Sequence, residues 1–279
     1  MATTQIEWAT QCFNPVIGCK PCSPGCNRCY AERVVKRLKF CNMGNERYYI
    51  AAKYRDCEKW DGTLSEFPER WEQPAHWRKP QRVFVGSQSD IALWTPDQIR
   101  RVELYASSPP PNPRAAQHKY MVLTKRPELL AEKAGHLLQY CWVGATVCNQ
   151  AEADAKIPAL LSIPAAGHWL CLEPMLEPID LLSATFSGSG SVSAMEGIDW
   201  VVLGGESGKG ARPMDVDWVR SIRDQCQAAG VAFWLKQAGS WLEAHPTDGI
   251  AYDGNGRVVL GYHLYNELPA GLRLPGEEP

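Results

Sequence analysis

The segment DWVVLGGESG, residues 199–208, is a short apolar run that ends in small and charged residues. The same form recurs along the chain in RVFVGSQSD (82–90), KYMVLTKRP (119–127), YCWVGATV (140–147), HWLCLEPM (168–175) and VAFWLKQAG (231–239). Nearly continuous apolar strands of this length are typical of a parallel sheet whose two faces are both covered. The recurring form therefore predicts buried, parallel strands.

Stretches with helical periodicity separate these runs. They are PDQIRRVELYA (96–106), PELLAEKAGHLL (127–138), QAEADAKIPALL (150–161) and DVDWVRSIRDQCQAAG (215–230). With FNPVIG (13–18) as a first strand, the alternation gives about seven βα units. We therefore expect an α/β fold, a partial or complete (β/α) barrel with parallel strands and outer helices. A doubly wound open sheet is the alternative, but no Gly-rich dinucleotide fingerprint follows the first strand.

The alternation extends over most of the chain and predicts one barrel domain over residues 1–240. Residues 41–80 are polar, aromatic and irregular, so we expect an insertion there. Residues 241–279 are rich in Gly, Pro and Asp and predict an irregular C-terminal extension, with a hairpin turn at Asp253–Gly254.

Charge and hydropathy limit the partners of the protein. The formal net charge is −2 and the pI about 6.3, so any DNA or RNA contact must come from a local basic patch. The N-terminal stretch MATTQIEW lacks a basic region followed by an apolar run, and no apolar stretch approaches the ~20 residues of a membrane span. We expect a cytoplasmic protein that does not enter a membrane.

Four of the 11 cysteines, Cys19, Cys22, Cys26 and Cys29, lie within the segment GCKPCSPGCNRCYAE (18–32). Disulfides are rare in a reducing compartment, which leaves a metal site or inert buried thiols. Zinc ligands usually form two close pairs separated by a longer loop, whereas only three residues separate the pairs here. Closely spaced thiolates are typical of iron–sulfur clusters. An iron–sulfur cluster is therefore favoured, and a compact four-thiolate zinc site is the alternative.

Polar residues end every predicted strand. In a parallel barrel the chemistry collects at these C-terminal ends. The candidates are Gly86, Ser87, Ser89, Asp90, Lys125, Arg126, Thr146, Glu173, Gly204, Gly205, Glu206 and Lys236. A surface ion pair or a capping role explains any single one of them about as well as ligand contact does. Together they predict a ring of charges and hydrogen-bond donors around one site.

Several segments together resemble a known family. NPVIGC, SPGCNRCYAE, VFVGSQSD, LTKRP, WVGATV, CLEPM, VVLGGESGKGARPM and FWLKQAG, in this order over residues 4–240, are similar to a phage- and prophage-associated family with a three-cysteine motif. That family is considered a radical S-adenosylmethionine (SAM) relative of spore photoproduct lyase. The resemblance implies a radical SAM barrel with a [4Fe-4S] cluster and SAM as cofactors.

Two choices of cluster ligands remain open. The three cysteines of the family match Cys19, Cys26 and Cys29, whereas the commoner radical SAM spacing, C-x3-C-x2-C, matches Cys22, Cys26 and Cys29. Ligation by all four cysteines would leave no open iron for SAM. Cys26 and Cys29 are common to both choices.

The resemblance also implies a reaction, and strand order alone suggests the residues that would serve it. A reduced cluster would cleave SAM to a 5′-deoxyadenosyl radical that acts on a nucleic acid or nucleotide, as in DNA repair or modification. Ser87, Ser89 and Asp90 would accept the ammonium group of SAM, and Lys125 or Arg126 would bind its carboxylate. We place Lys125, Arg126 and Glu206 in the catalytic set. The residues expected to bind cofactor are Gly86, Ser87, Ser89, Asp90, Thr146, Glu173, Gly204 and Gly205.

The partners expected from the resemblance are a reductant, such as flavodoxin or ferredoxin, and the three-Cys-motif partner protein that accompanies the family. Two other functions compete with radical SAM chemistry. One is a zinc-stabilised nucleic-acid-binding module without catalysis. The other is an iron–sulfur protein that acts only as a sensor.

Overall fold

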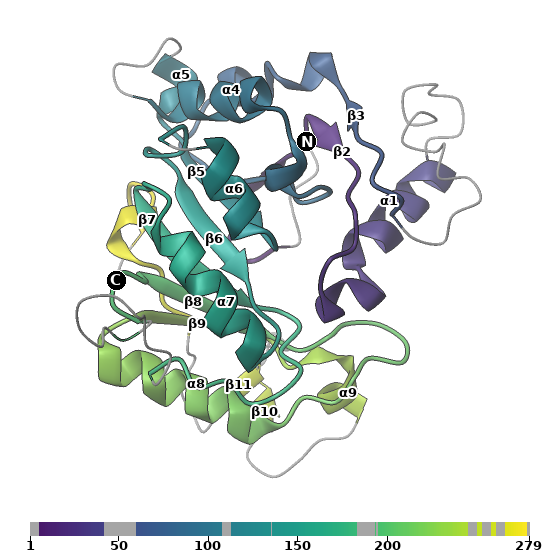
Figure 1. The fold of residues 1–279 in the computed structure, drawn as a ribbon, viewed down its shortest axis with the longest axis vertical. Coiled ribbons are helices and arrows are strands. Elements are labelled where there is room, and N and C mark those ends of the chain that lie inside the picture. The colour runs from purple at the N-terminus through teal and green to yellow at the C-terminus, as the bar shows by residue number, and fades with distance from the viewer. Residues whose placement is uncertain are drawn as a thin grey trace. The chain divides into compact units, whose positions relative to one another are not determined.

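A computed structural model describes residues 6–41, 60–107, 113–134, 136–182, 193, 195–244, 250–252, 258–260 and 266–277. Seven strands form one sheet, and their order in the sheet follows the chain: β1 (Gln11–Phe13), β4 (Arg82–Val85), β5 (Lys119–Thr124), β6 (Trp142–Thr146), β7 (Gly167–Leu172), β8 (Trp200–Gly204) and β9 (Ala232–Gln237) (Figure 1). The pairs β1–β4, β4–β5, β7–β8 and β8–β9 are all parallel. The predicted α/β fold with the parallel strands of a partial (β/α) barrel is confirmed.

The first strand differs from the prediction. The strand in the sheet is Gln11–Phe13, and residues 16–17 of the predicted strand form β2 (Val16–Ile17), which pairs antiparallel with β3 (Ser65–Glu66). Pro15 has no N–H to donate to a neighbouring strand. The Asn14 side chain instead hydrogen-bonds Ser87 and the N–H of Gln88. The chain therefore leaves the sheet after Phe13, before the cysteine segment begins at Gly18.

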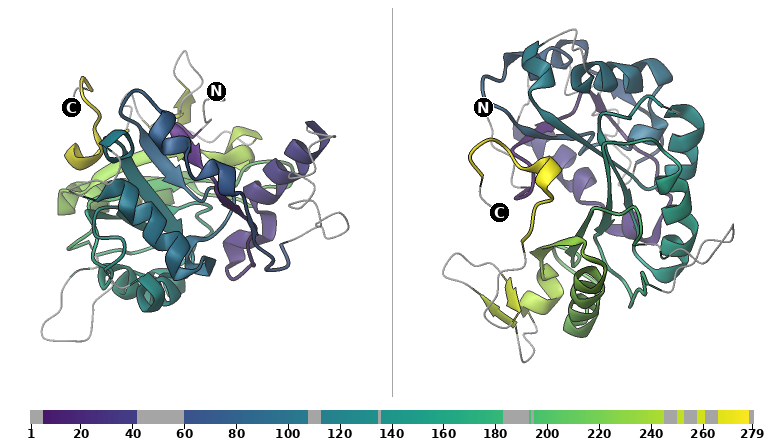
Figure 2. Two further views of the ribbon diagram at one scale, coloured as in Figure 1. Left: turned by 90° about the horizontal axis from the view of Figure 1, so that it is seen from above. Right: turned by 90° about the vertical axis from the view of Figure 1, so that its left-hand side faces the viewer.

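Contacts along the chain define two compact units. Unit 1 comprises residues 1–142 and 163–166. Its helices are α1 (Tyr30–Cys41), α3 (Gln73–His76), α4 (Pro96–Ala106), α5 (Pro113–Ala116) and α6 (Pro127–Ala134), together with the 3-10 turns η1 (Pro24–Arg28), η3 (Pro68–Arg70) and η4 (Ile91–Leu93). Helix α4 contacts both α5 and α6 (Figure 2). This unit carries the cysteine segment.

The predicted insertion at 41–80 is described only from residue 60 onward, and residues 42–59 lie outside the described residues. The described part contributes buried aromatic side chains to the core of unit 1. Trp71 is fully buried and lies edge-on to the rings of Phe13 and Trp94. This part of the insertion therefore belongs to the core, although its short elements carry little sequence periodicity.

Unit 2 comprises residues 143–162 and 167–279, with helices α7 (Gln150–Leu161), α8 (Val216–Ala229) and α9 (Gly239–Ala244). The rings of Trp169, Trp200 and Trp234 pack in series across β7, β8 and β9. The predicted C-terminal hairpin is present as β10 (Ile250–Tyr252) paired antiparallel with β11 (Val258–Leu260). Its predicted turn at Asp253–Gly254 lies outside the described residues. A final 3-10 turn, η5 (Ala270–Leu272), follows. Across the described residues, no helix has the length and hydropathy needed to cross a membrane.

Candidate functional site

The cysteine segment folds into a short turn between β2 and α1. Ser23 caps η1 by accepting a hydrogen bond from the N–H of Gly25 at 3.1 Å, and the N–H of Cys26 donates to the Ser23 carbonyl at 2.9 Å. The turn ends at Cys29, and α1 begins at the next residue. Two of the four cysteines, Cys19 and Cys29, pack against an apolar cluster that consists of Ile17, Ala31, Trp60 and Phe67.

The four thiols differ in their electrostatic surroundings. A hydrogen bond between the side chains of Cys22 and Cys26 lowers the pKa of Cys26 to about 5 and raises the pKa of Cys22. The positive charge of Lys125 also lowers the pKa of Cys26. Burial raises the pKa of Cys19 to about 12, with smaller contributions from neighbouring charges. Of Cys19, Cys22 and Cys26, Cys26 is therefore the one most readily present as a thiolate.

The donor set of this segment fits an iron–sulfur or zinc centre, because four thiols lie within 11 residues. Thiolates are the ligands that both centres use. Among the residues that the structure describes, no three Cys, His, Asp or Glu side chains already stand in the geometry of a metal site. The four thiols therefore match the ligand type of an iron–sulfur or zinc centre but not yet its geometry. To bind either centre, their side chains must turn toward one another.

Hydrogen bonds fasten the segment to the end of β4. The N–H of Gly18 donates to the Gln88 carbonyl at 3.1 Å, and Gly18 forms a parallel bridge with Ser89. The Tyr30 hydroxyl donates to the Ser87 carbonyl at 2.9 Å. The segment is thereby held at both of its ends beside the loop that follows β4.

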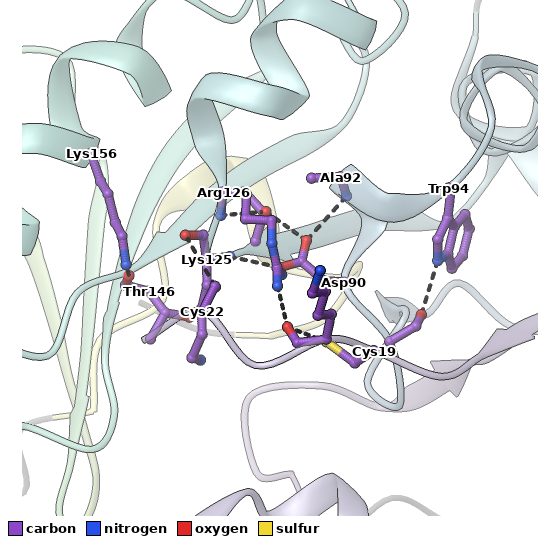
Figure 3. Close-up of polar contacts among 12 residues, drawn as sticks. Cys19, Cys22, Asp90, Ala92, Trp94, Lys125, Arg126, Thr146 and Lys156 are labelled. Atoms are coloured by element: carbon purple, nitrogen blue, oxygen red, sulfur yellow. Dashed lines mark hydrogen bonds and ion pairs between the residues drawn. The ribbon is translucent and has the colours of Figure 1, made fainter. Parts of the chain in front are cut away.

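Asp90 and Arg126 form a buried ion pair beside the cysteine segment (Figure 3). Arg126 Nη1 donates to Asp90 Oδ2 at 2.8 Å, and Arg126 Nη2 donates to the carbonyl of Lys20. Asp90 also accepts from the Thr124 hydroxyl at 2.6 Å and from the N–H groups of Ala92 and Lys125, each at 3.1 Å. Cys22 Sγ lies 4.0 Å from the Lys125 carbonyl oxygen. The Asp90–Arg126 salt bridge thus joins the ends of β4 and β5, and the hydrogen bond from Arg126 to Lys20 adds a further link to the cysteine segment.

The other residues predicted after β4 are held in local contacts. Gly86 has a φ of 73°, and a side chain there would press against Ser89 Oγ at 3.2 Å. Ser89 Oγ accepts from the indole N–H of Trp94 at 3.0 Å, and Ser87 Oγ exchanges hydrogen bonds with the Asn14 amide. These contacts shape the loop, and the hydroxyl of each serine already takes part in one of them.

In unit 2, Thr146 ends β6 and is 1% exposed. Its carbonyl accepts a hydrogen bond from Lys156 Nζ at 3.2 Å (Figure 3). Lys156 also pairs with Glu152 at 2.9 Å. Thr146 Oγ1 has no hydrogen-bond partner among the described residues. Buried hydroxyls are usually hydrogen-bonded, so this atom marks a position where a ligand or water is expected.

A second polar group of unit 2 joins the ends of β7 and β9. Lys236 Nζ lies 2.7 Å from each carboxylate oxygen of Glu173, and Gln237 Nε2 donates to Glu173 Oε1 at 2.6 Å. A Cβ on Gly204, in the strand between, would lie 3.3 Å from Glu173 Cδ and from Gln237 Cγ. Gly204 therefore provides the space in which these side chains meet.

The loop after β8 is closed by Glu206 and Arg212. Glu206 is buried and accepts from Arg212 through both carboxylate oxygens. The hydrogen bond to Glu206 raises the pKa of Arg212. Gly205 packs directly on the backbone at Ala238 and Gly239. Glu206 thus fixes this loop, and its carboxylate is not open for proton transfer as it stands.

A comparison with family models matches residues 3–269 to proteins of unknown function, DUF5131. The chain belongs to the DUF5131 family. Searches of curated proteins and of solved structures gave no match.

Sequence reasoning missed three side chains of this DUF5131 protein that shape the candidate site. These are Asn14, Lys156 and Arg212. Arg212 lies in the segment VVLGGESGKGARPM, six residues after Glu206, and its place in that segment was the available signal. Lys156 lies inside a helical stretch, where its apolar neighbours gave no sign that it would be buried.

Proposed function

We propose that this DUF5131 protein is a radical SAM iron–sulfur enzyme that acts on a nucleic acid or a nucleotide. The observation that carries the proposal is the position of the cysteine segment. Four thiols within 11 residues follow the first strand of a parallel sheet and are fastened to the C-terminal ends of the next two strands. Active sites of parallel α/β folds lie at those ends.

In this proposal Cys26, Cys29 and either Cys19 or Cys22 hold a [4Fe-4S] cluster. When bound, the cluster and SAM supply reductive cleavage of the sulfonium to a 5′-deoxyadenosyl radical, with the electron taken from a reductant such as flavodoxin or ferredoxin. The apolar cluster beneath Cys19 and Cys29 keeps water away from one side of the thiols. The lowered pKa of Cys26 favours the deprotonated ligand.

The contacts refine the proposed SAM roles. Asp90 and Arg126 already bind each other and their neighbours, and Lys125 is kept as the candidate to bind the carboxylate of SAM. Its charge acts on Cys26, which supports a position beside the cluster. Ser89 keeps a hydroxyl proton after accepting from Trp94, which suits it to donate to SAM rather than to accept its ammonium group.

Thr146 and Glu173 remain candidates for the ribose of SAM or for substrate. Thr146 is a candidate because its Oγ1 has no hydrogen-bond partner among the described residues. Glu173 is a candidate because 18% of its side chain is exposed. Glu206 is better assigned to the loop that it holds with Arg212. A nucleic-acid substrate and a three-Cys-motif partner rest on the family resemblance, which is a weaker argument than the site.

The test is anaerobic purification followed by an absorption spectrum, assays for iron, sulfide and zinc, and incubation with dithionite and SAM. About four irons per chain and formation of 5′-deoxyadenosine are expected. Cys12→Ser, which changes a cysteine outside the segment, is the matched control for Cys26→Ser. A colourless protein with one tightly bound zinc would support the nucleic-acid-binding module instead. Iron and sulfide without SAM cleavage, with or without nucleic acid, would support the sensor.

A further inference from the structure

The carboxylate of Asp90 has no acceptor position left for a ligand. Each of its oxygens accepts two hydrogen bonds from the protein, and its side chain is 7% exposed. A carboxylate offers about four lone-pair sites, so these four donors saturate it. An ammonium group of SAM would therefore have to displace a protein donor in order to bind there.

Arg126 is engaged on both sides. One nitrogen of its guanidinium binds Asp90, and another binds the carbonyl of Lys20, which lies between Cys19 and Cys22 (Figure 3). A planar guanidinium can span two acceptors in a fixed geometry, which an ammonium group does less well. Asp90 orients the guanidinium, and the guanidinium holds the cysteine segment.

We propose that Asp90 and Arg126 are positioning residues that fix the cysteine segment at the ends of β4 and β5, rather than residues that bind SAM. This inference rests on the proposed function in one respect: the proposed function makes the cysteine segment the cofactor site. Its physical content, a buried charge pair that fixes the path of residues 18–29, belongs to the metal-free chain. Removing one partner leaves the other charge buried without compensation. We therefore expect the segment around residues 18–29 to be destabilised.

The experiment is amide hydrogen exchange, followed by mass spectrometry, on the reduced, metal-free protein. The variants are Asp90→Asn and Arg126→Ala, and the reporters are peptides that cover residues 18–29. Exchange at Gly18, Gly25 and Cys26, whose N–H groups are bonded, should accelerate roughly ten- to a hundred-fold when a charged hydrogen bond is lost. Exchange in β8 and α8 of unit 2 should stay unchanged.

Arg220→Ala is the matched control, because it removes an arginine that pairs with Asp217 on the surface of α8. Chemical rescue separates positioning from general stability. Millimolar guanidinium ion should restore protection of residues 18–29 in Arg126→Ala, whereas ammonium ion should not. Iron uptake on reconstitution should follow the same order, with loss in Arg126→Ala and recovery with guanidinium.

Unchanged exchange of residues 18–29 in both variants would overturn the proposal. Equal acceleration throughout unit 1 in Arg126→Ala, without rescue, would also overturn it, since the pair would then serve only global stability. If Asp90→Asn does not fold, Arg126→Lys replaces it and should show faster exchange confined to the segment. A wild-type protein that takes up no iron but shows these exchange changes would refute the proposed function and leave the positioning role standing.

Discussion

The guanidinium of Arg212 forms a bidentate pair with the carboxylate of Glu206: Nη2 lies 2.5 Å from Oε1, and Nε lies 3.1 Å from Oε2. The N–H of Arg212 adds a third hydrogen bond to Oε2 at 2.9 Å. The Glu206 side chain is 4% exposed and that of Arg212 is 29% exposed. Bidentate hydrogen bonds between charged groups are among the stronger hydrogen bonds in proteins. The pair therefore holds the loop after β8 in one conformation.

Arg212→Ala removes both side-chain hydrogen bonds from Arg212 to the buried Glu206 carboxylate. We expect a loss of about 2–3 kcal/mol in the free energy of unfolding, less than for a wholly buried pair because Arg212 is partly exposed. Urea unfolding measures the loss. Arg220→Ala, at the surface pair with Asp217, should cost about 0.5 kcal/mol or less. Equal losses in the two variants would contradict a specific role for the Glu206–Arg212 pair.

Gly205 permits close backbone packing between the loop after β8 and the end of β9. A Cβ at this position would lie 2.4 Å from the Ala238 carbonyl oxygen and 2.9 Å from Gly239 Cα. Backbone atoms cannot move aside as a flexible side chain can, so Gly205→Ala should cost about 2–3 kcal/mol in the free energy of unfolding.

The matched comparison for Gly205→Ala is Gly230→Ala at the C-terminus of α8. Gly230 has a φ of 69°, and a Cβ added there would meet no neighbouring atom within 4 Å, so only the backbone conformation is penalised. We expect about 1 kcal/mol there. Urea unfolding measures the loss in the free energy of unfolding for both variants. A smaller loss for Gly205→Ala than for Gly230→Ala would mean that the backbone around Gly205 moves easily to make room for the Cβ.

The sequence was most informative where the local pattern and the tertiary structure agree. Helices α4 and α7 match the predicted ranges 96–106 and 150–161 at both ends. Thr95 and Asn149 cap these helices in the structure, and each accepts the hydrogen bond expected of an N-cap. The strand at 13–18 was placed wrongly because an apolar run does not reveal which of its residues pair with the sheet. Asn14 and Pro15 end the pairing with the sheet at Phe13.

Sequence reasoning placed the charged residues at the strand ends but could not pair them. Asp90 was expected to bind a ligand, yet its donors come from residues 92 and 124–126, which only the register of β4 against β5 brings together. Lys236 and Glu173 meet across 63 residues of sequence. Pairing of this kind depends on strand order and on small residues such as Gly204 between the strands. A single sequence does not encode it in a local pattern.

His118 should make the stability of the fold depend on pH. Its ring is buried, with Nε2 2.9 Å from the Pro74 carbonyl oxygen, which requires a proton on Nε2. A second proton would go to Nδ1, which is buried and has no partner among the described residues. Burial accordingly lowers the pKa of His118, against a weaker opposing effect of the Pro74 bond.

Because the pKa of His118 is lower in the folded state than in the unfolded chain, the unfolded chain binds the proton first as pH falls. The stabilisation is fully present above about pH 6.5 and is lost as the pH falls through the folded pKa. The extra slope is at most about 1.4 kcal/mol per pH unit. Urea unfolding from pH 8 to pH 5 should show it in the wild type and in His76→Gln, an exposed control, but not in His118→Gln. Parallel curves for all three proteins would refute the prediction.

In the proposed function either Cys19 or Cys22 is the third cluster ligand, and substitution can test which. Cys19 shares the apolar cluster with Cys29, whereas Cys22 is exposed, with its Sγ 4.0 Å from the Lys125 carbonyl oxygen. We therefore expect Cys19→Ser to lose most of the iron on anaerobic reconstitution, and Cys22→Ser to keep about the wild-type amount. Iron and sulfide assays measure both, with Cys12→Ser as the control. The reverse order would assign the ligand to Cys22, and loss in both variants would indicate four-thiolate ligation without an open iron.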